Sequence, residues 1–296
     1  MKIRRLKENI YRLVFAILAF SSLIFLLGIV ITLFKEGYPI FSQIGITEFI
    51  FGKNWYPTFS TPEFGTLPLI LASLWVTAGA MVVCVPLGVG SALYLYELAG
   101  ARQRAILKPV IELLAGIHSI VFGFFGMVIV APFLQRTLHL NVGLTAFTAS
   151  LILGIMAIPT VCSLTEDALS FVPKSFKEAS YALGANRWQT LTRVVIPAAG
   201  SGISTAVILG MSRVVGETMV VLMVAGGAAI IPTTFFEPVR PMTSTIAAEM
   251  GEAVFGSLHY HALFGIGLIL FLITLIFNVI AEYISMKYRI KLGHGR

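Results

Sequence analysis

Two charged residues interrupt an otherwise apolar stretch of the sequence, and they are the first candidates for chemistry. Arg213 and Glu217 lie within the apolar run 200–231. An Arg at the centre of a bilayer costs about 2.5–3.5 kcal/mol on insertion scales, so it is expected to be paired or to line a path. Residues four apart share a helix face, so the two can pair. The guanidinium fork suits an oxyanion, with the carboxylate competing for the same donors; a purely structural ion pair is the alternative.

The polar stretch 165–199 holds the second group of candidates. Pro173 suits the first turn of a helix, Gly184 is a natural helix stop, and Trp188 lies near the start of a second helical stretch. The pattern predicts two short helices joined at Gly184, where we expect a positive φ or a close backbone approach. Such an elbow is either an amphipathic connector that lies on lipid headgroups or a knob that docks into a soluble partner.

The composition shows which elements must position these residues. Of the 296 residues, 57% are hydrophobic and 12% are charged, which excludes a soluble or a disordered chain. Six continuous apolar runs are each long enough to cross a bilayer as a helix, and none alternates as a barrel strand does. The runs are 13–34, 67–96, 113–135, 140–165, 200–231 and 262–281. The first follows a basic N-terminus but is too long for a cleaved signal, so we expect it to be a span.

The distribution of basic residues predicts an orientation. With the N-terminus placed inside, sixteen of the 21 Lys and Arg residues fall in inside segments and four in outside loops, with Arg213 in the membrane. This asymmetry supports six spans with both termini in the cytoplasm. It also explains the net charge of +7 without nucleic acid as a partner.

Several kinds of chemistry are not expected from this sequence. Cys84 and Cys162 lie inside apolar runs and are expected to be buried packing residues. Glu249, Glu252, His259 and His261 in the last outside loop are expected to be exposed polar residues rather than metal ligands. The sequence contains no P-loop, His-Glu-x-x-His or Gly-x-Ser-x-Gly motif, so we expect a protein that is not an enzyme and carries no cofactor.

The residues of the elbow resemble the EAA loop of the permeases of ABC importers. The matching residues are Glu178-Ala179-Ser180, then Gly184 after three residues, Val194 after nine more, and Ile196-Pro197 after one more. The family pattern has Ala, Ile and Leu in place of Ser180, Val194 and Ile196. The resemblance implies that the elbow is a coupling helix seated in an ATP-hydrolysing subunit, with Glu178, Ala179, Ser180 and Gly184 as coupling residues.

Further motifs along nearly the whole chain are similar to those of the phosphate-specific permeases. They are Phe64-Gly65-Thr66-Leu67-Pro68, Pro86-Leu87-Gly88, Tyr94-Leu95-Tyr96-Glu97, Glu112-Leu113-Leu114-Ala115-Gly116-Ile117 and Gly216-Glu217-Thr218. The long first outside loop, with Gly52-Lys53-Asn54-Trp55-Tyr56-Pro57, resembles the PstC-type member of the permease pair. His118 stands where related sequences have Pro, which puts the local kink in doubt. The resemblance implies that Arg213 contacts phosphate in transit and that Glu217 holds and resets it.

The predicted protein is therefore an all-α integral membrane protein that resembles the type I ABC importer permease fold. Its expected segments are a cytoplasmic basic N-terminus (1–12), a first span (13–34), an extracytoplasmic loop (35–66), a core of five spans (67–285) with the coupling loop at 165–199, and a cytoplasmic basic C-terminus (286–296).

The resemblance implies a homologous second permease, an ATPase dimer and an extracytoplasmic phosphate-binding protein as partners, in a lipid membrane. Three other interpretations stay open: the PstA-type partner, a permease for another oxyanion such as molybdate or sulfate, and a self-sufficient secondary transporter.

Overall fold

The computed structural model describes residues 2–291, so Met1 of the expected N-terminal segment and residues 292–296 of the expected C-terminal segment lie outside it. The chain begins with helix α1 (Lys2–Ile44), followed by α2 (Ile46–Phe51) and an antiparallel hairpin of β1 (Trp55–Tyr56) and β2 (Glu63–Phe64). Trp55 pairs with Phe64 in this hairpin. The predicted first span, 13–34, is the middle of α1.

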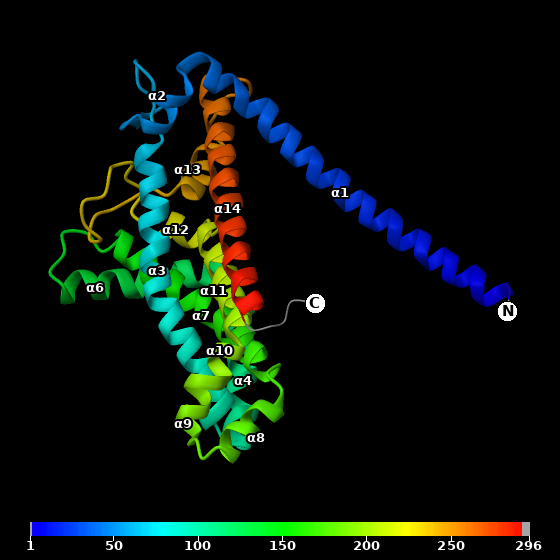
Figure 1. The fold of residues 1–296 in the computed structure, drawn as a ribbon. Helices are drawn as coiled ribbons and strands as arrows, with labels where there is room; N and C mark the ends of the chain where they lie inside the picture. The colour runs from blue at the N-terminus through cyan, green and yellow to red at the C-terminus, as the bar shows by residue number, and fades with distance from the viewer. Residues whose placement is uncertain (1, 292–296) are drawn as a thin grey trace.

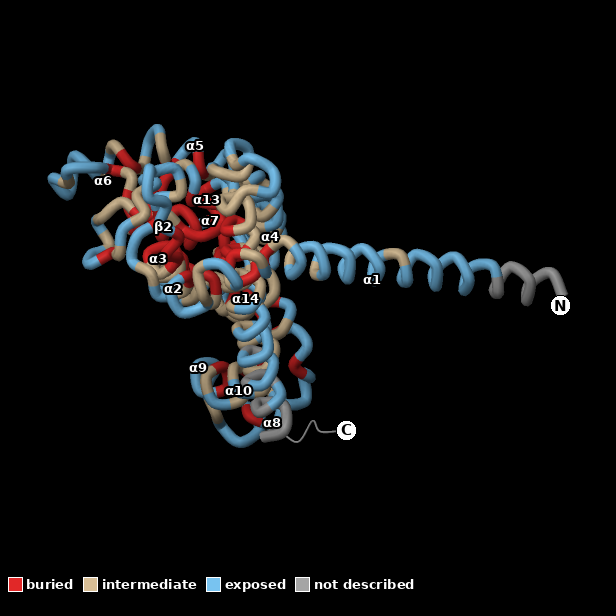
Figure 2. Tube along the Cα trace, turned by 90° about the horizontal axis from the view of Figure 1, so that it is seen from above, coloured by how far each residue is buried: buried red, intermediate tan, exposed pale blue. Residues whose placement is uncertain are grey.

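Helix α1 runs away from the rest of the molecule, which gathers around the other long helices (Figure 1). From Ile10 onward its side chains are mostly exposed, as the pale blue tube in Figure 2 shows. Near its C-terminal end, Ile40 is buried against Phe49, Leu263 and Ile266. An exposed apolar helix of this length needs lipid or another protein around it.

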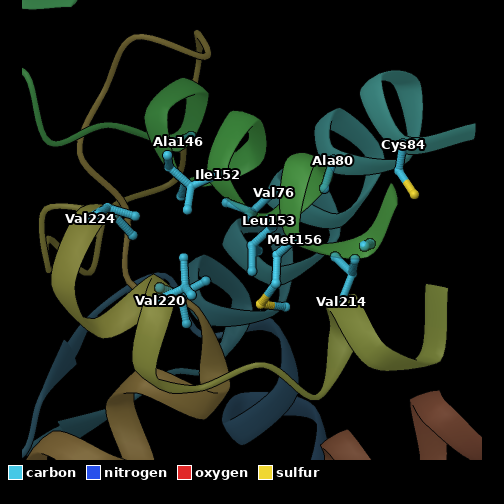
Figure 3. Close-up of a cluster of buried hydrophobic side chains, with 14 of the residues drawn as sticks. Val76, Ala80, Cys84, Ala146, Ile152, Leu153, Met156, Val214, Val220 and Val224 are labelled. Atoms are coloured by element: carbon cyan, nitrogen blue, oxygen red, sulfur yellow. The ribbon is translucent and has the colours of Figure 1, made fainter. Parts of the chain in front are cut away.

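The centre of the fold is the pair formed by α3 (Leu67–Leu93) and α7 (Ala146–Ser170). Small residues let the two backbones approach: a Cβ added at Gly154 would lie 2.8 Å from Cβ of Val83. Aliphatic side chains from both helices join Val214, Val220 and Val224 in the main core (Figure 3). Cys84 and Cys162 are both buried and free, as the sequence predicts. A π-helical segment, η1 (Tyr94–Leu98), extends α3.

The predicted third span is interrupted. The chain forms α4 (Ala101–Ala115), then α5 (Ser119–Phe125), the π-segment η2 (Gly126–Val130) and α6 (Ala131–Thr137). The break falls at Gly116–His118. His118, which stands where related sequences have Pro, has an extended backbone and is exposed. The run 113–135 therefore covers the end of α4 and most of the segment Ser119–Thr137, and only that segment is long and apolar enough to cross a membrane.

The elbow connects α7 to the next span. It consists of α8 (Lys174–Ala182), α9 (Arg187–Thr190), the π-segment η3 (Leu191–Val195) and α10 (Ile196–Ala198), and it continues into α11 (Gly200–Val215). The helical stretch that begins at Arg187 bends by 69° at Ala199 before α11. The two predicted short helices on either side of Gly184 are present.

The predicted fifth span, 200–231, is wrong in extent. Helix α11 ends at Val215, and a short helix α12 (Met219–Val224) follows after a break. A loop then leads to α13 (Met242–Glu249) and to the last helix, α14 (Leu258–Lys291), which contains the predicted sixth span. The apolar run 216–231 is therefore not a continuous helix, and its buried residues are the four on and after α12, Val220, Val221, Val224 and Ala225.

Within residues 2–291, five helices are long and apolar enough to cross a membrane, and the bent pair of Arg187–Ala198 and Gly200–Val215 makes a sixth. The mostly helical architecture and a count of up to six spans agree with the sequence-based prediction. Below, the end of the molecule that carries α8 and α9 is called the elbow end, and the end that carries the β-hairpin is called the hairpin end (Figure 1).

Candidate functional site

The turn of the elbow is built by local hydrogen bonds around Gly184. The amide of Gly184 donates to the carbonyl of Tyr181 at 2.9 Å, and the amide of Ala185 donates to Ser180 at 3.2 Å. Gly184 has φ +83°, which confirms the predicted positive φ. A Cβ there would meet no atom within 4 Å, so the glycine serves backbone conformation and not a close approach.

The elbow has two limbs, α8 before Gly184 and α9, η3 and α10 after it, and the second limb begins with a capping box. The side chain of Asn186 accepts from the amide of Gln189 at 2.8 Å, and the side chain of Gln189 accepts from the amide of Asn186 at 3.0 Å. The hydroxyls of Ser180 and Thr190 lie 2.9 Å apart and are both buried, so they join the two limbs. The elbow is thus a folded unit with its own internal bonds.

The outer surface of the elbow and of the turn before it exposes large apolar side chains among polar ones. Leu183 is 89% exposed, Trp188 69% and Phe171 86%. Glu178 and Ala179 are also exposed, whereas Ser180 is not. Of the four predicted coupling residues, Glu178, Ala179 and Gly184 are therefore exposed, and only Ser180 is buried. Exposed apolar side chains gathered on a protruding turn are typical of a protein interaction site.

A buried carboxylate that the sequence analysis missed ties α7 to α4 at the elbow end. Glu166 is 1% exposed and forms ion pairs with Arg104 and with Lys108, whose Nζ lies 2.6 Å from Oε2. The hydrogen bond to Glu166 raises the pKa of Lys108 above its ordinary value, although burial acts against this. The only signal in the sequence was an acidic residue near the end of an apolar run, which did not reveal partners about 60 residues away.

A second ion pair joins the elbow itself to the end of α3. Lys177 on α8 lies 2.8 Å from Oε2 of Glu97 on η1, and its Nζ lies 4.2 Å from the centre of the Tyr96 ring. The side chain of Glu97 is 10% exposed and that of Lys177 is 23% exposed. The pKa of Lys177 is raised, because the bonds to Glu97 and Tyr96 outweigh the opposing effect of burial. Lys177 is therefore charged at neutral pH.

The predicted pairing of Arg213 with Glu217 is not what the structure shows. The helix stops at Val215, so the four-residue spacing no longer places both side chains on one face. The Glu217 carboxylate instead accepts from the amide of Met219 at 3.1 Å, at the N-terminus of α12. Arg213 is exposed, and its neighbour Ser212 donates to the side chain of Asn278 on α14 at 2.9 Å. Among the described residues, the exposed Arg213 has no carboxylate partner.

At the hairpin end, the prediction of simply exposed polar residues is wrong for Glu249, His259 and His261, whose side chains are 13%, 14% and 17% exposed. Its carboxylate accepts from Nε1 of Trp55 at 3.0 Å, pairs with Arg240 at 2.5 Å and lies 2.9 Å from Nε2 of His259. His261 contacts the backbone carbonyl of Glu36 through Nδ1 at 2.8 Å. Glu249 therefore joins the hairpin, the loop before α13 and the start of α14.

Comparison with known proteins places this architecture in a family. Residues 84–290 match the family described as "Binding-protein-dependent transport system inner membrane component". The chain belongs to this family. The match covers the core from the middle of α3 to the end of α14, including the whole elbow, and it establishes a multi-pass membrane component of a transport system rather than an enzyme.

Two curated relatives match nearly the whole chain. A probable ABC transporter permease, YqgH of Bacillus subtilis (strain 168), is 35% identical over 97% of this chain and 94% of its own length. The phosphate transport system permease protein PstC of Mesorhizobium japonicum is 37% identical over 93% of this chain and 89% of its own length.

Solved structures share the fold at lower identity. The chain resembles a subunit of a bacterial alginate ABC transporter with a TM-score of 0.66 and 15% identity, covering 93% of this chain and 94% of that one. It resembles a subunit of the MetNI methionine ABC transporter with a TM-score of 0.59 and 18% identity, covering 73% and 93%. These likenesses confirm the importer permease fold.

Proposed function

We propose that this chain is a membrane-spanning permease subunit of an ATP-driven importer of inorganic phosphate. The observation that carries the proposal is the elbow, a folded unit built around Gly184 that exposes Leu183 and Trp188 beyond the span helices. A protruding apolar turn of this kind is suited to insertion into a groove of a soluble partner. The similarity to the PstC permease of Mesorhizobium japonicum supports phosphate as the solute.

The proposal fixes an orientation and a set of partners. The elbow end faces the cytoplasm of a prokaryotic cell, since the elbow loop belongs to the segments rich in Lys and Arg, and both termini lie on that side. A pair of ATPase subunits binds the elbow of this chain and of a second, related permease. A separate phosphate-binding protein delivers the anion to the hairpin end.

Arg213 is the residue that we assign to the anion. It lies in the last turn of α11, exposed and free of Glu217, so its planar fork of donors is available to phosphate oxygens. Glu217 holds the break between α11 and α12 by accepting from Met219, and Thr243 donates to the carbonyl of Glu217 at 2.8 Å. In this arrangement Glu217 keeps Arg213 in position rather than competing directly for its donors.

Reconstitution tests the proposed function. The chain is purified with its neighbouring permease and ATPase subunits, inserted into vesicles, and supplied with the binding protein, ATP and labelled phosphate. We expect uptake that needs both ATP and the binding protein. Uptake by this chain alone without nucleotide would contradict the proposal. Uptake of molybdate or sulfate in preference to phosphate would show that the solute is another oxyanion, while the ATP-driven mechanism would stand.

A substitution tests the assignment of Arg213. Arg213→Gln in an assembled complex is expected to lower phosphate uptake at least tenfold, because a charge-assisted bidentate contact is lost. Arg213→Lys keeps the positive charge but lacks the planar fork of donors, so its phosphate uptake is expected to lie between those of the wild type and of Arg213→Gln. The control is Arg136→Gln, which removes an exposed positive charge from the end of α6. Near-normal uptake by Arg213→Gln would remove Arg213 from the path.

A further inference from the structure

The two limbs of the elbow are connected to two different spans. The second limb (α9, η3 and α10) continues directly into α11, the helix that carries Arg213. Its Leu191 and Val195 are buried in a cluster with Leu95 and Leu169. The first limb, α8, has no such continuation toward α3, and the pair of Lys177 and Glu97 supplies that connection.

The geometry of η1 explains why two neighbouring residues converge on one lysine. In this π-helical segment the amide of Ala99 donates to the carbonyl of Tyr94 at 2.8 Å. The wider turn changes the angle between successive side chains, and π-segments are enriched at functional positions for this reason. Glu97 then meets the Lys177 ammonium at 2.8 Å while the Tyr96 ring lies 4.2 Å from it. The ammonium therefore has both an ionic and a cation–π partner on the same turn.

The two limbs also cannot move independently of each other. The hydrogen bond between Ser180 and Thr190 is buried between them, and the turn at Gly184 closes the unit. A displacement of the elbow is therefore delivered to α11 through the chain itself, and to the end of α3 through Lys177 and through the apolar cluster that Leu191 and Val195 share with Leu95. Because α3 packs along α7 in the core, a movement of α3 reaches the centre of the bundle.

We propose that Lys177 is a positioning residue that couples the elbow to α3 by holding Glu97 and Tyr96. This inference rests on the proposed function, since it says how the displacement of the elbow by an ATPase reaches the spans. Breaking the link leaves the docking surface and the ATPase unaltered but weakens the connection of the elbow to α3, which then rests on the apolar cluster alone. The expected signature is ATP hydrolysis that continues while less phosphate crosses per ATP.

Glu97→Gln is the sharpest variant, because Glu97 lies on η1 and not on the docking elbow. In reconstituted vesicles, we expect the variant complex to assemble, to hydrolyse ATP and to move about fivefold less phosphate per ATP, the upper range for a partly exposed ion pair. Lys177→Met is expected to behave alike, whereas Lys177→Arg keeps both partners and most of the coupling. The matched control is Glu112→Gln, an exposed carboxylate on α4.

The exchanged pair separates coupling from simple destabilisation. Combining Lys177→Glu with Glu97→Lys restores an ion pair, and we expect it to recover at least half of the phosphate moved per ATP. A ratio of phosphate to ATP that stays within twofold of wild type in both Glu97→Gln and Lys177→Met would overturn the proposal. If the wild-type complex itself moves no phosphate, the proposed function fails and not the link.

A covalent link provides a test that does not depend on assembly of the charge variants. Lys177 and Glu97 line an open depression of about 610 Å³, which a bifunctional thiol reagent can enter. With Cys84 and Cys162 replaced by Ala, Lys177→Cys and Glu97→Cys together are expected to be uncoupled, and cross-linking them is expected to restore transport. If cross-linking stops transport while ATP is still hydrolysed, the elbow and η1 separate during the cycle and the proposal is wrong.

Discussion

The hairpin end and the elbow end of this protein are both held by carboxylates, but in different ways. At the hairpin end the single carboxylate of Glu249 accepts a hydrogen bond from Trp55, pairs with Arg240 and contacts His259, so three distant segments share one junction. At the elbow end, Glu166 and Glu97 serve separate partners, and the exposed apolar side chains lie beyond them. A shared junction makes one rigid cap, whereas separate links allow parts of the elbow end to move relative to one another.

The largest effect is expected from removing the shared junction. Glu249→Ala leaves Trp55 without its acceptor and Arg240 without its ion-pair partner in a mostly buried site, which costs about 3 kcal/mol. We expect a clear fall in the thermal unfolding midpoint of the purified protein. Glu252→Ala, at an exposed position three residues on, is the control and should unfold as wild type does. Equal midpoints for both variants would show that the hairpin end is not held by one junction.

The turn of the elbow is the next largest target. Gly184→Val forces a β-branched residue to φ +83°, at a cost of about 2 kcal/mol or more, and should abolish co-purification of the ATPase subunit. Gly184→Asn is the matched variant at the same position, because Asn tolerates the left-handed region, and it should retain the partner. If both variants lose the ATPase subunit equally, the added side chain, and not the backbone conformation at residue 184, prevents binding.

The bond between the two limbs should contribute less. Ser180→Ala leaves the Thr190 hydroxyl buried without its partner and should weaken ATPase binding by about 1 kcal/mol. Adding Thr190→Val removes the orphaned hydroxyl, so the double variant should bind better than the sum of the two single effects predicts. Titration of the ATPase subunit against each permease variant measures the cycle. Strict additivity would mean that the two hydroxyls do not cooperate.

The smallest effect is a pH dependence at the loop before α13. Hydrogen bonds from the hydroxyl and amide of Thr233 hold the pKa of Glu237 below its ordinary value. The stabilisation is therefore complete above the ordinary carboxyl pKa and is lost as the pH falls through the lowered one. Phe235 lies in the same loop, and its ring is 4.9 Å from that of Trp75 on α3. The fluorescence of Trp75 therefore reports the change. Glu237→Gln should remove the acid transition, and an unchanged transition would assign it to another group.

The features that sequence patterns predicted correctly are those with local causes. The two limbs of the elbow, its glycine turn and its second helix depend on bonds between residues a few positions apart, such as Asn186 with Gln189. The burial of Cys84 and Cys162 and the apolar spans follow from composition alone. The prediction that the run 200–231 is one helix failed, because the apolar residues resume after the break at Gly216–Thr218 and Gly216 was not recognised as a helix stop.

The amino-acid sequence by itself determined that the chain crosses a membrane several times and carries an elbow of two short helices, because hydrophobicity, glycine conformation and capping act over short distances. Only the tertiary structure decided which charges meet. Glu97 finds Lys177, and Glu166 finds Arg104 and Lys108, across 58 to 80 residues of sequence. Arg213 loses its expected partner because the helix between them ends. Such pairings depend on how whole helices pack, and a spacing of four residues cannot anticipate them.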